Sequence, residues 1–310
     1  NKIRLGIAKL ENIRFRLSLH SPFTIFVRIS KAIFQDMRHI IQTATAILLL
    51  TANMQGLYAK TFLPPEEVKT IKVGDTKVTW LQDNGSKQRA AIFPGVPQSL
   101  LDSLGVADGI PSSMSAFLVE REGKQILFDT GLGKVGSRLL PLLESLGIKP
   151  EDIKYLYLTH FHGDHIGGML DGDKVVFPNA EVYASKKEYE AWMNMPPEKN
   201  RQAVKTMKAY KERLHLFEFG DTLPGNIIAM DAAGHTPGHT AFLAGKALIA
   251  GDIMHGVALQ LVRPDVCPTY DMDKDAAIAS RKRILSYARK NGLLLCGMHF
   301  PAPAFLKLDK

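Results

Sequence analysis

Short apolar segments separated by polar turns dominate the chain beyond its first 60 residues. Four of them are rich in β-branched, aromatic and leucine side chains and predict strands: 70–73, 77–81, 116–120 and 125–128. The last two segments are joined by a turn at Arg121, Glu122 and Gly123, which predicts a hairpin. This part of the chain is therefore expected to begin a sheet.

Helical patterns follow these strands. Residues 137–146 predict a helix that has Ser137 as its N-cap and ends before Gly147. Residues 186–192 and 275–291 predict two more helices. In a basic segment between them, apolar side chains recur at helical spacing and predict a surface helix with that stripe facing inward: Ala203, Met207, Tyr210 and Leu214.

Four further apolar segments predict strands, and each is followed by a side chain that can bind a metal. The segments are 153–158, 227–230, 247–250 and 293–296. The side chains that follow them begin with His160, His235, Asp252 and His299. Strands that each deliver one such side chain suit a site along one edge of a sheet. With the helices, they predict an α/β fold, a four-layer αββα sandwich with two facing sheets and helices outside.

The densest of these sites is residues 159–165. His160 and His162 lie two positions apart, so at the end of a strand they project to the same side and can grip one cation. The turn at Gly163 brings Asp164 and His165 towards a second cation. Imidazole and carboxylate are the ligands that zinc prefers. The alternative is a polar loop with solvated histidines, which four ligand-type side chains in six positions make a poor explanation.

The chain resembles the metallo-β-lactamase-fold hydrolases from about residue 73 to about residue 303. The likeness rests on His160-x-His162-x-Asp164-His165, then His235, Asp252 and His299. A narrower likeness points to the branch that holds methyl parathion hydrolase and related lactonases. It is carried by the segments 111–119, 177–180 and 299–301.

The resemblance implies two divalent metal ions per chain, with zinc the favoured ion. The first would be held by His160, His162 and His235, and the second by Asp164, His165 and His299. Asp252 would bridge the two ions, and a shared hydroxide would be the nucleophile. Two dications, two carboxylates and one hydroxide leave a residual positive charge, which favours an oxyanion transition state.

Further roles are implied for carboxylates and histidines around the metals. Asp252, as the bridge, and Asp164 are the expected catalytic residues, and Asp164 would move a proton to the leaving group. The segment 127–133 resembles an early strand and turn of the family, whose Asp129 would support the metal ligands. His239 is expected to hydrogen-bond the backbone or a ligand residue rather than a metal.

Substrate choice is expected to depend on residues 189–214, an insert that would form an apolar wall over the metals. The candidates for the pocket are Trp192, Met193 and Tyr210 from this insert, and His255 from the strand end near Asp252. For any one insert residue, simple packing against the sheet is at least as probable. His255 could equally face solvent.

Composition changes this picture little. The chain has 310 residues, 45% of them hydrophobic, which suffices for one large core. Residues 1–59 hold eight Lys or Arg and two Asp or Glu, so +6 of the formal charge of +8 lies there. The remainder of the chain is therefore nearly neutral, and no nucleic-acid partner is expected. Cys267 and Cys296 could form a disulfide or be simply buried.

The N-terminal part has a separate character. Residues 1–36 are basic and have no predicted role in the native structure. Residues 37–59 combine a short basic start with an apolar middle, which predicts a secretory signal peptide and a periplasmic or secreted protein. The apolar run is short for a membrane span, so no stable membrane anchor is expected. Residues 60–310 would form the hydrolase domain.

These features favour a metal-dependent hydrolase of small apolar molecules. A dinuclear centre would cleave lactone, aryl-ester or phosphotriester bonds. A glyoxalase II-like thioesterase or a sulfur-transforming enzyme on the same fold is the first alternative, and it would need a cationic pocket. A metal-free binding protein of this fold is the second alternative. The sequence leaves the metal, the physiological substrate and a homodimer open.

Overall fold

The structure, a computed structural model, describes residues 67–134 and 136–309. The predictions for residues 1–36 and for the signal peptide at 37–59 lie outside these residues. None of the helices in the described part is both long enough and apolar enough to cross a membrane.

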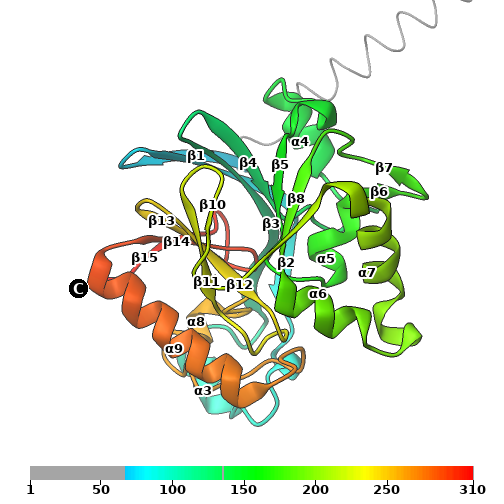
Figure 1. The fold of residues 1–310 in the computed structure, drawn as a ribbon. Coiled ribbons are helices and arrows are strands. Elements are labelled where there is room, and N and C mark those ends of the chain that lie inside the picture. The colour runs from blue at the N-terminus through cyan, green and yellow to red at the C-terminus, as the bar shows by residue number, and fades with distance from the viewer. Residues whose placement is uncertain (1–66, 135, 310) are drawn as a thin grey trace, which may run out of the picture. The chain divides into compact units, whose positions relative to one another are not determined.

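The first sheet has seven strands in the order β1-β2-β3-β4-β5-β8-β9 (Figure 1). Their bounds are β1 Val68–Val73, β2 Thr76–Gln88, β3 Ile110–Arg121, β4 Lys124–Phe128, β5 Tyr155–Tyr157, β8 Glu181–Ser185 and β9 Leu214–Phe217. The first four strands pair antiparallel, whereas β4, β5, β8 and β9 pair in parallel. The strands predicted between residues 70 and 128 are all present, and β2 and β3 are longer than their apolar segments.

The second sheet has six strands in the order β10-β11-β12-β13-β14-β15. Their bounds are β10 Thr222–Leu223, β11 Ile227–Asp231, β12 Thr240–Ala244, β13 Ala247–Gly251, β14 Leu294–Gly297 and β15 Phe305–Lys307. Only the β13–β14 pair is parallel. A third, two-stranded sheet joins β6 Leu170–Asp171 to β7 Lys174–Val175.

Alternating side chains of the first sheet enter two different cores. Phe117 of β3 packs between the sheets, and its neighbour Leu118 packs on the opposite face. This is the two-residue period of a strand that is buried on both sides. The core between the sheets contains Phe242 of β12, whose ring centroid lies 5.3 Å from that of Phe128 and 5.6 Å from that of Tyr157.

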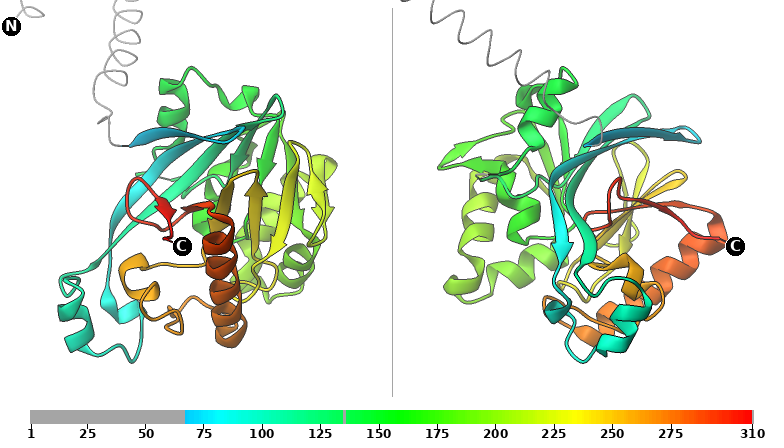
Figure 2. Two further views of the ribbon diagram at one scale, coloured as in Figure 1. Left: turned by 90° about the vertical axis from the view of Figure 1, so that its left-hand side faces the viewer. Right: turned by 180° about the vertical axis from the view of Figure 1, so that it is seen from behind.

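Helices cover the outer faces of both sheets (Figures 1 and 2). Side chains of α4 Leu139–Ser145, α6 Lys186–Met193 and α7 Pro197–Ala209 pack on the outer face of the first sheet. Side chains of α9 Lys274–Asn291 pack against the second sheet. The remaining helices are short: α3 Gln98–Ser103, α5 Gly163–Ile166 and α8 Val257–Gln260. The predicted four-layer αββα sandwich is confirmed.

Two local predictions need correction, and the alternatives left open for the two cysteines are decided. The N-cap of α4 is Arg138, because the Ser137 hydroxyl donates to Asp83, whose carboxylate also accepts the backbone N–H of Leu139. The helix predicted through residue 214 ends earlier, and Leu214 begins β9. Cys267 and Cys296 are both buried as free thiols, so they form no disulfide.

Removal of the Phe242 ring should test the packing between the sheets. Because this side chain is fully buried among Phe128, Tyr157 and Phe217, Phe242→Ala should lower the free energy of unfolding by about 3–5 kcal/mol. Urea unfolding of the metal-free protein would measure the loss. Val262→Ala is the control, because Val262 is 58% exposed and its truncation should cost less than about 0.5 kcal/mol. Equal losses in both variants would contradict this packing.

Candidate metal centre

The predicted ligands project from the ends of four strands. His160 and His162 lie in the loop after β5, and Asp164 and His165 lie on α5 directly after this loop. The other three ligands follow the second sheet: His235 comes after β11, Asp252 after β13 and His299 after β14. Since β13 and β14 run in parallel, their carboxyl ends meet at the same edge.

The strand end before Asp252 requires glycine. Gly251 has φ +54°, and a Cβ atom there would lie 2.3 Å from Nε2 of His239. That close approach allows His239 Nε2 to accept a hydrogen bond from the backbone N–H of Asp252 at 2.9 Å. Nδ1 of the same ring hydrogen-bonds the carbonyl oxygen of Ala232 at 2.9 Å. His239 therefore holds the backbone beside Asp252, which is the type of role expected for it.

The first ligand group consists of His160, His162 and His235. Nδ1 of His162 lies 3.0 Å from Nε2 of His160 and 2.9 Å from Nε2 of His235. The chain thus brings three imidazole nitrogens from two loops to one point.

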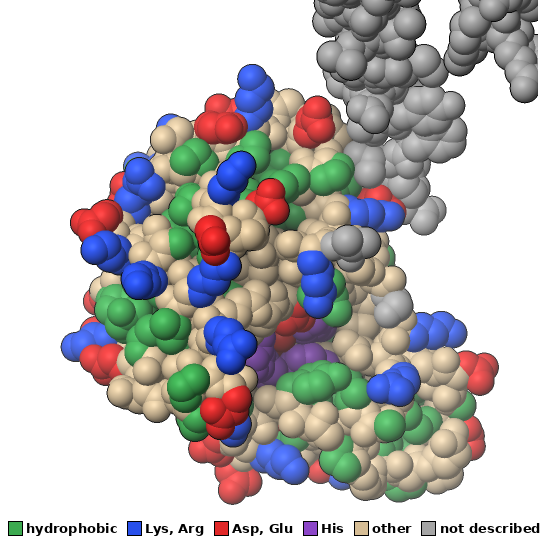
Figure 3. Space-filling view, turned by 90° about the vertical axis from the view of Figure 1, so that its right-hand side faces the viewer, with side chains coloured by type: hydrophobic (Ala, Val, Ile, Leu, Met, Phe, Trp, Pro, Cys, Tyr) green, Lys and Arg blue, Asp and Glu red, His purple; other side chains and the backbone are tan. Residues whose placement is uncertain are grey.

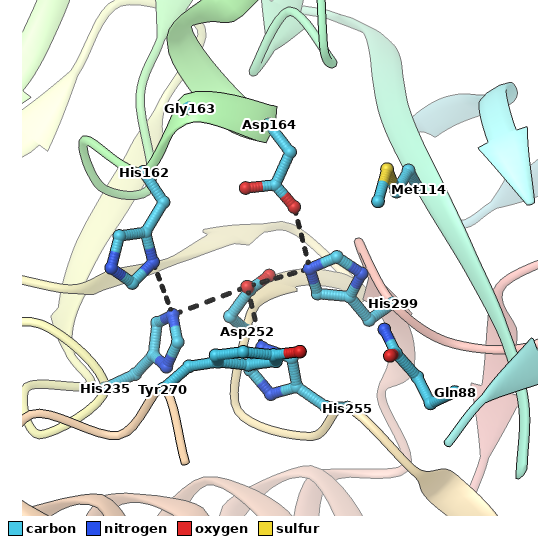
Figure 4. Close-up of a pocket in the computed structure, with 10 residues that line it drawn as sticks. All are labelled: Gln88, Met114, His162, Gly163, Asp164, His235, Asp252, His255, Tyr270 and His299. Atoms are coloured by element: carbon cyan, nitrogen blue, oxygen red, sulfur yellow. Dashed lines mark hydrogen bonds and ion pairs between the residues drawn. The ribbon is translucent and has the colours of Figure 1, made fainter. Parts of the chain in front are cut away.

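The second ligand group consists of Asp164, His165 and His299. Figure 4 shows Asp252 between His235 of the first group and His299 of the second. Oδ2 of Asp252 lies 3.0 Å from Nε2 of His299 and 3.3 Å from Nε2 of His165. The same oxygen lies 3.5 Å from Nε2 of His235 in the first group. Oδ2 of Asp164 is 3.3 Å from Nε2 of His299. All seven predicted ligands therefore come together, and Asp252 has the position expected of a bridge.

Outer hydrogen bonds fix which nitrogen of each ring faces inward. Nδ1 of His165 donates to Oδ2 of Asp129 at 2.7 Å, and Nδ1 of His299 donates to the carbonyl oxygen of Ser113 at 2.8 Å. Nδ1 of His235 donates to Oδ1 of Asp271 at 2.9 Å. Each ring consequently directs its Nε2 atom to the centre.

Asp129 supports a second element of the centre as well. Its Oδ1 accepts the backbone N–H of Thr159 at 2.8 Å, and its Oδ2 accepts the Thr159 hydroxyl at 2.7 Å. The Thr159 oxygen is then free to accept from Nδ1 of His160, 3.0 Å away. Asp129 thus orients His165 directly and His160 through Thr159, in line with its expected supporting role.

The donor set fits divalent cations. Imidazole nitrogens and carboxylate oxygens face one another at 2.9–3.5 Å, and without a cation among them protons on His165 and His299 must offset their repulsion. Oδ1 of Asp252 is buried without a hydrogen-bond partner. An unpaired buried acceptor costs about 1–3 kcal/mol, whereas zinc binds this mixture of nitrogen and oxygen ligands. The residues present therefore fit a pair of ions of this type.

Burial and charge set the protonation of the ligands. Burial lowers the pKa of His162 to about 4 and that of His235 to about 3, so both rings are neutral at pH 7. Burial alone would also lower the pKa of His299, but the Asp252 and Asp164 carboxylates outweigh it and raise this pKa to about 10. Burial would raise the pKa of Asp164, yet His165 and His299 hold it below its ordinary value.

A cavity of about 380 Å³ opens onto the ligands. Figure 3 shows histidine side chains at the bottom of this hollow, with hydrophobic side chains at its edge. Besides ligands, the cavity is lined by Gln88, Met114, Gly163, His255 and Tyr270 (Figure 4). His255 was expected as a pocket candidate, and its Nε2 lies 3.2 Å from Oδ2 of Asp252.

The insert does not line this cavity. Trp192, Met193 and Tyr210 pack with the core on the outer face of the first sheet. The Tyr210 hydroxyl donates to the carbonyl oxygen of Met169 at 2.9 Å and accepts from the backbone N–H of Phe177 at 3.2 Å. None of the three lines this cavity, so a pocket wall from the insert stays a prediction, and their contacts are those of the packing alternative.

Three supporting residues were not predicted from the sequence. Asp271 joins His235 to Arg281 of α9, whose Nη2 lies 3.0 Å from Oδ2 of Asp271. Ser113 provides the carbonyl oxygen that orients His299, and its hydroxyl donates to the carbonyl oxygen of Phe300 at 2.6 Å. Glu188 of α6 is the third. None follows a ligand at a regular spacing, although Ser113 lies in the segment 111–119 that carried the narrower resemblance.

Comparison with known proteins assigns the family. Residues 110–299 match the metallo-beta-lactamase superfamily, and the chain belongs to this superfamily. The predicted family is confirmed, and with it the prediction of a hydrolase.

Three relatives illustrate the likeness. YobT, an uncharacterized protein of Bacillus subtilis (strain 168), is 30% identical over 146 residues, which cover 45% of this chain and 61% of YobT. The match thus spans less than two thirds of that relative. The hydrolase AbOPH aligns with a TM-score of 0.72 at 27% identity, over 80% of this chain and 95% of AbOPH. AidC, a dizinc quorum-quenching lactonase, aligns with a TM-score of 0.68 at 28% identity, over 78% and 97%.

Metal binding should release protons from the centre. In the metal-free protein His299 is protonated at neutral pH because its pKa is raised to about 10, and a metal ligand must be neutral. Zinc binding at pH 7.5 should therefore release about one proton or more from this region. Calorimetric titrations in buffers of different ionisation enthalpy would measure the number. Release should fall as the pH rises past 10, and binding without release at pH 7.5 would contradict the assignment.

Proposed function

We propose that the chain is a dinuclear metal-dependent hydrolase that cleaves lactone, aryl-ester or phosphotriester bonds of small, largely apolar substrates. The observation that carries this proposal is the convergence of seven side chains of the types that bind metals, five imidazoles and two carboxylates. Asp252 lies within 3.5 Å of ligand nitrogens in both groups, which suits a carboxylate shared by two ions.

The ligand groups would hold one divalent ion each, most readily zinc, with Asp252 between them. The bound ions would act as Lewis acids and make hydroxide available near neutral pH. The protein's part is to hold the rings in fixed tautomers through Asp129, Asp271 and Ser113.

Asp164 is suited to move the proton. Its side chain is 22% exposed and borders the cavity, whereas that of Asp252 is 2% exposed. Because His165 and His299 keep the pKa of Asp164 below its ordinary value, this carboxylate is ionised at neutral pH. It could accept a proton from the attacking water and pass it to the leaving group.

The cavity favours a small substrate with an uncharged body. Met114 and Tyr270 offer apolar surface, and Tyr270 is 44% exposed at the site. No Lys or Arg lines this cavity in the described part of the chain, and an adjoining pocket that shares Met114, Gly163 and Asp164 with it contains one, Lys134. A thioesterase that binds an anionic thiol carrier would need a cationic pocket, which one lysine does not provide, so the lactone, ester and phosphotriester class is preferred. A nucleic-acid substrate is disfavoured for the same reason.

A panel of substrates should test the class. Zinc-loaded protein would be assayed with an N-acyl homoserine lactone, an aryl acetate, an aryl dialkyl phosphate, an acyl thioester and single-stranded DNA. We expect turnover of at least one of the first three to exceed that of the thioester and the DNA. Hydrolysis confined to the thioester or to the DNA would contradict the proposal.

Removal of the bridging carboxylate should abolish the activity. Asp252→Ala should lower kcat/KM by more than about 100-fold, because loss of supporting residues alone typically costs 10–100-fold. The metal content should fall at the same time, as measured by elemental analysis after dialysis. Asp173→Ala is the matched control, because the Asp173 side chain is 93% exposed. Activity retained in Asp252→Ala would show that the reaction takes place elsewhere.

A further inference from the structure

Glu188 of α6 is a buried carboxylate that no metal-binding motif contains. Its side chain is almost completely buried. Among the described residues it forms no ion pair with a Lys, Arg or His. Four hydrogen-bond donors surround it instead, and a buried carboxylate of this kind needs that number to replace its hydration.

The two oxygens of Glu188 join two loops that supply the first ligand group. Oε1 accepts the backbone N–H of Phe161 at 3.0 Å, and Phe161 lies between His160 and His162. Oε2 accepts the Thr236 hydroxyl at 2.9 Å and the backbone N–H of Gly238 at 2.7 Å. Thr236 directly follows His235, so one side chain connects both ligand loops.

The same carboxylate connects these loops to α6. Oε1 also accepts the indole N–H of Trp192 at 2.6 Å. The Trp192 ring meets the His162 ring edge-on, with centroids 5.6 Å apart and an interplanar angle of 86°. At Gly238, an added Cβ would lie 2.1 Å from the backbone nitrogen of Glu188. The loop after His235 is therefore pressed directly against the start of α6.

We propose that Glu188 is a positioning residue that sets the distance between the two loops of the first ligand group and so determines the affinity of this group for its metal ion. The inference rests on the proposed dinuclear function. The second ligand group is held by other residues, since Asp129 orients His165 and Ser113 orients His299. Substitution of Glu188 should therefore lower the affinity for the ion of the first group more than the affinity for the ion of the second.

Glu188→Gln is the most informative variant because it changes the hydrogen bonding of the side chain but preserves its shape. A glutamine amide has one acceptor oxygen and one NH₂ donor, so the NH₂ group would face two donors. With the NH₂ group in the place of Oε1, the Phe161 and Trp192 bonds would be lost. In the place of Oε2 it would cost the Gly238 bond, because the Thr236 hydroxyl can accept from it. Glu190→Gln is the matched control, because Glu190 lies on the same helix and is exposed.

Zinc affinity would be measured by competition of metal-free protein with a chromophoric chelator. The binding step that disappears in His162→Ala identifies the ion of the first group. In Glu188→Gln, the affinity of this step should fall by about 10–100-fold, while the other step stays within about threefold of wild type. Both steps should be unchanged in Glu190→Gln. The melting temperature of each metal-free variant would show that the fold is intact.

The outcomes are distinct. Unchanged affinity of both steps in Glu188→Gln, or an equal loss in both, would overturn the positioning role. If wild type itself binds fewer than two zinc ions, the proposed function fails and this inference fails with it. If Glu188→Gln does not fold, Thr236→Val removes only one of the four donors without a change in volume. This variant should weaken the first step alone, by less than Glu188→Gln would, and an unchanged first step would overturn the inference.

Discussion

The structure around the candidate site depends on one constraint: buried imidazole nitrogens and carboxylate oxygens face one another at close range. Nitrogens of His160, His162 and His235 approach within about 3 Å, and Asp252 lies between them and the second ligand group. Protons or cations must neutralise this repulsion. The outer hydrogen bonds commit the Nδ1 atoms of four rings elsewhere, so the surroundings are arranged for cations.

The fold offsets this repulsion by distributing the ligands over both sheets, which pack against each other. The first sheet carries His160, His162, Asp164 and His165 after β5, and the second sheet carries the remaining three. Aromatic side chains, with Phe242 among them, hold the sheets together away from the centre. The repulsive cluster is thus stabilised by packing that does not itself take part in metal binding.

Much of this could be predicted from the sequence because strand period and ligand type are local signals. Apolar segments that end in His or Asp identified all four strand ends of the site. The residues that hold the ligands in place could not be predicted, because Asp271 and Glu188 act through contacts between segments far apart in the chain. The role of Trp192 and Tyr210 could not be decided from the sequence for a related reason: an apolar stripe shows that a side chain is buried, but not whether the core or a substrate buries it. Their indole N–H and hydroxyl instead satisfy Glu188 and Met169.

The presence of two cations at the acceptor cluster is the central claim. Anomalous diffraction from crystals of the zinc-soaked protein, recorded at the zinc edge, tests it most directly. Two peaks are expected, one within about 2.0–2.2 Å of the inward nitrogens of His160, His162 and His235 and one equally close to Asp164, His165 and His299. Zinc peaks only elsewhere on the protein, or none at this cluster, would contradict it.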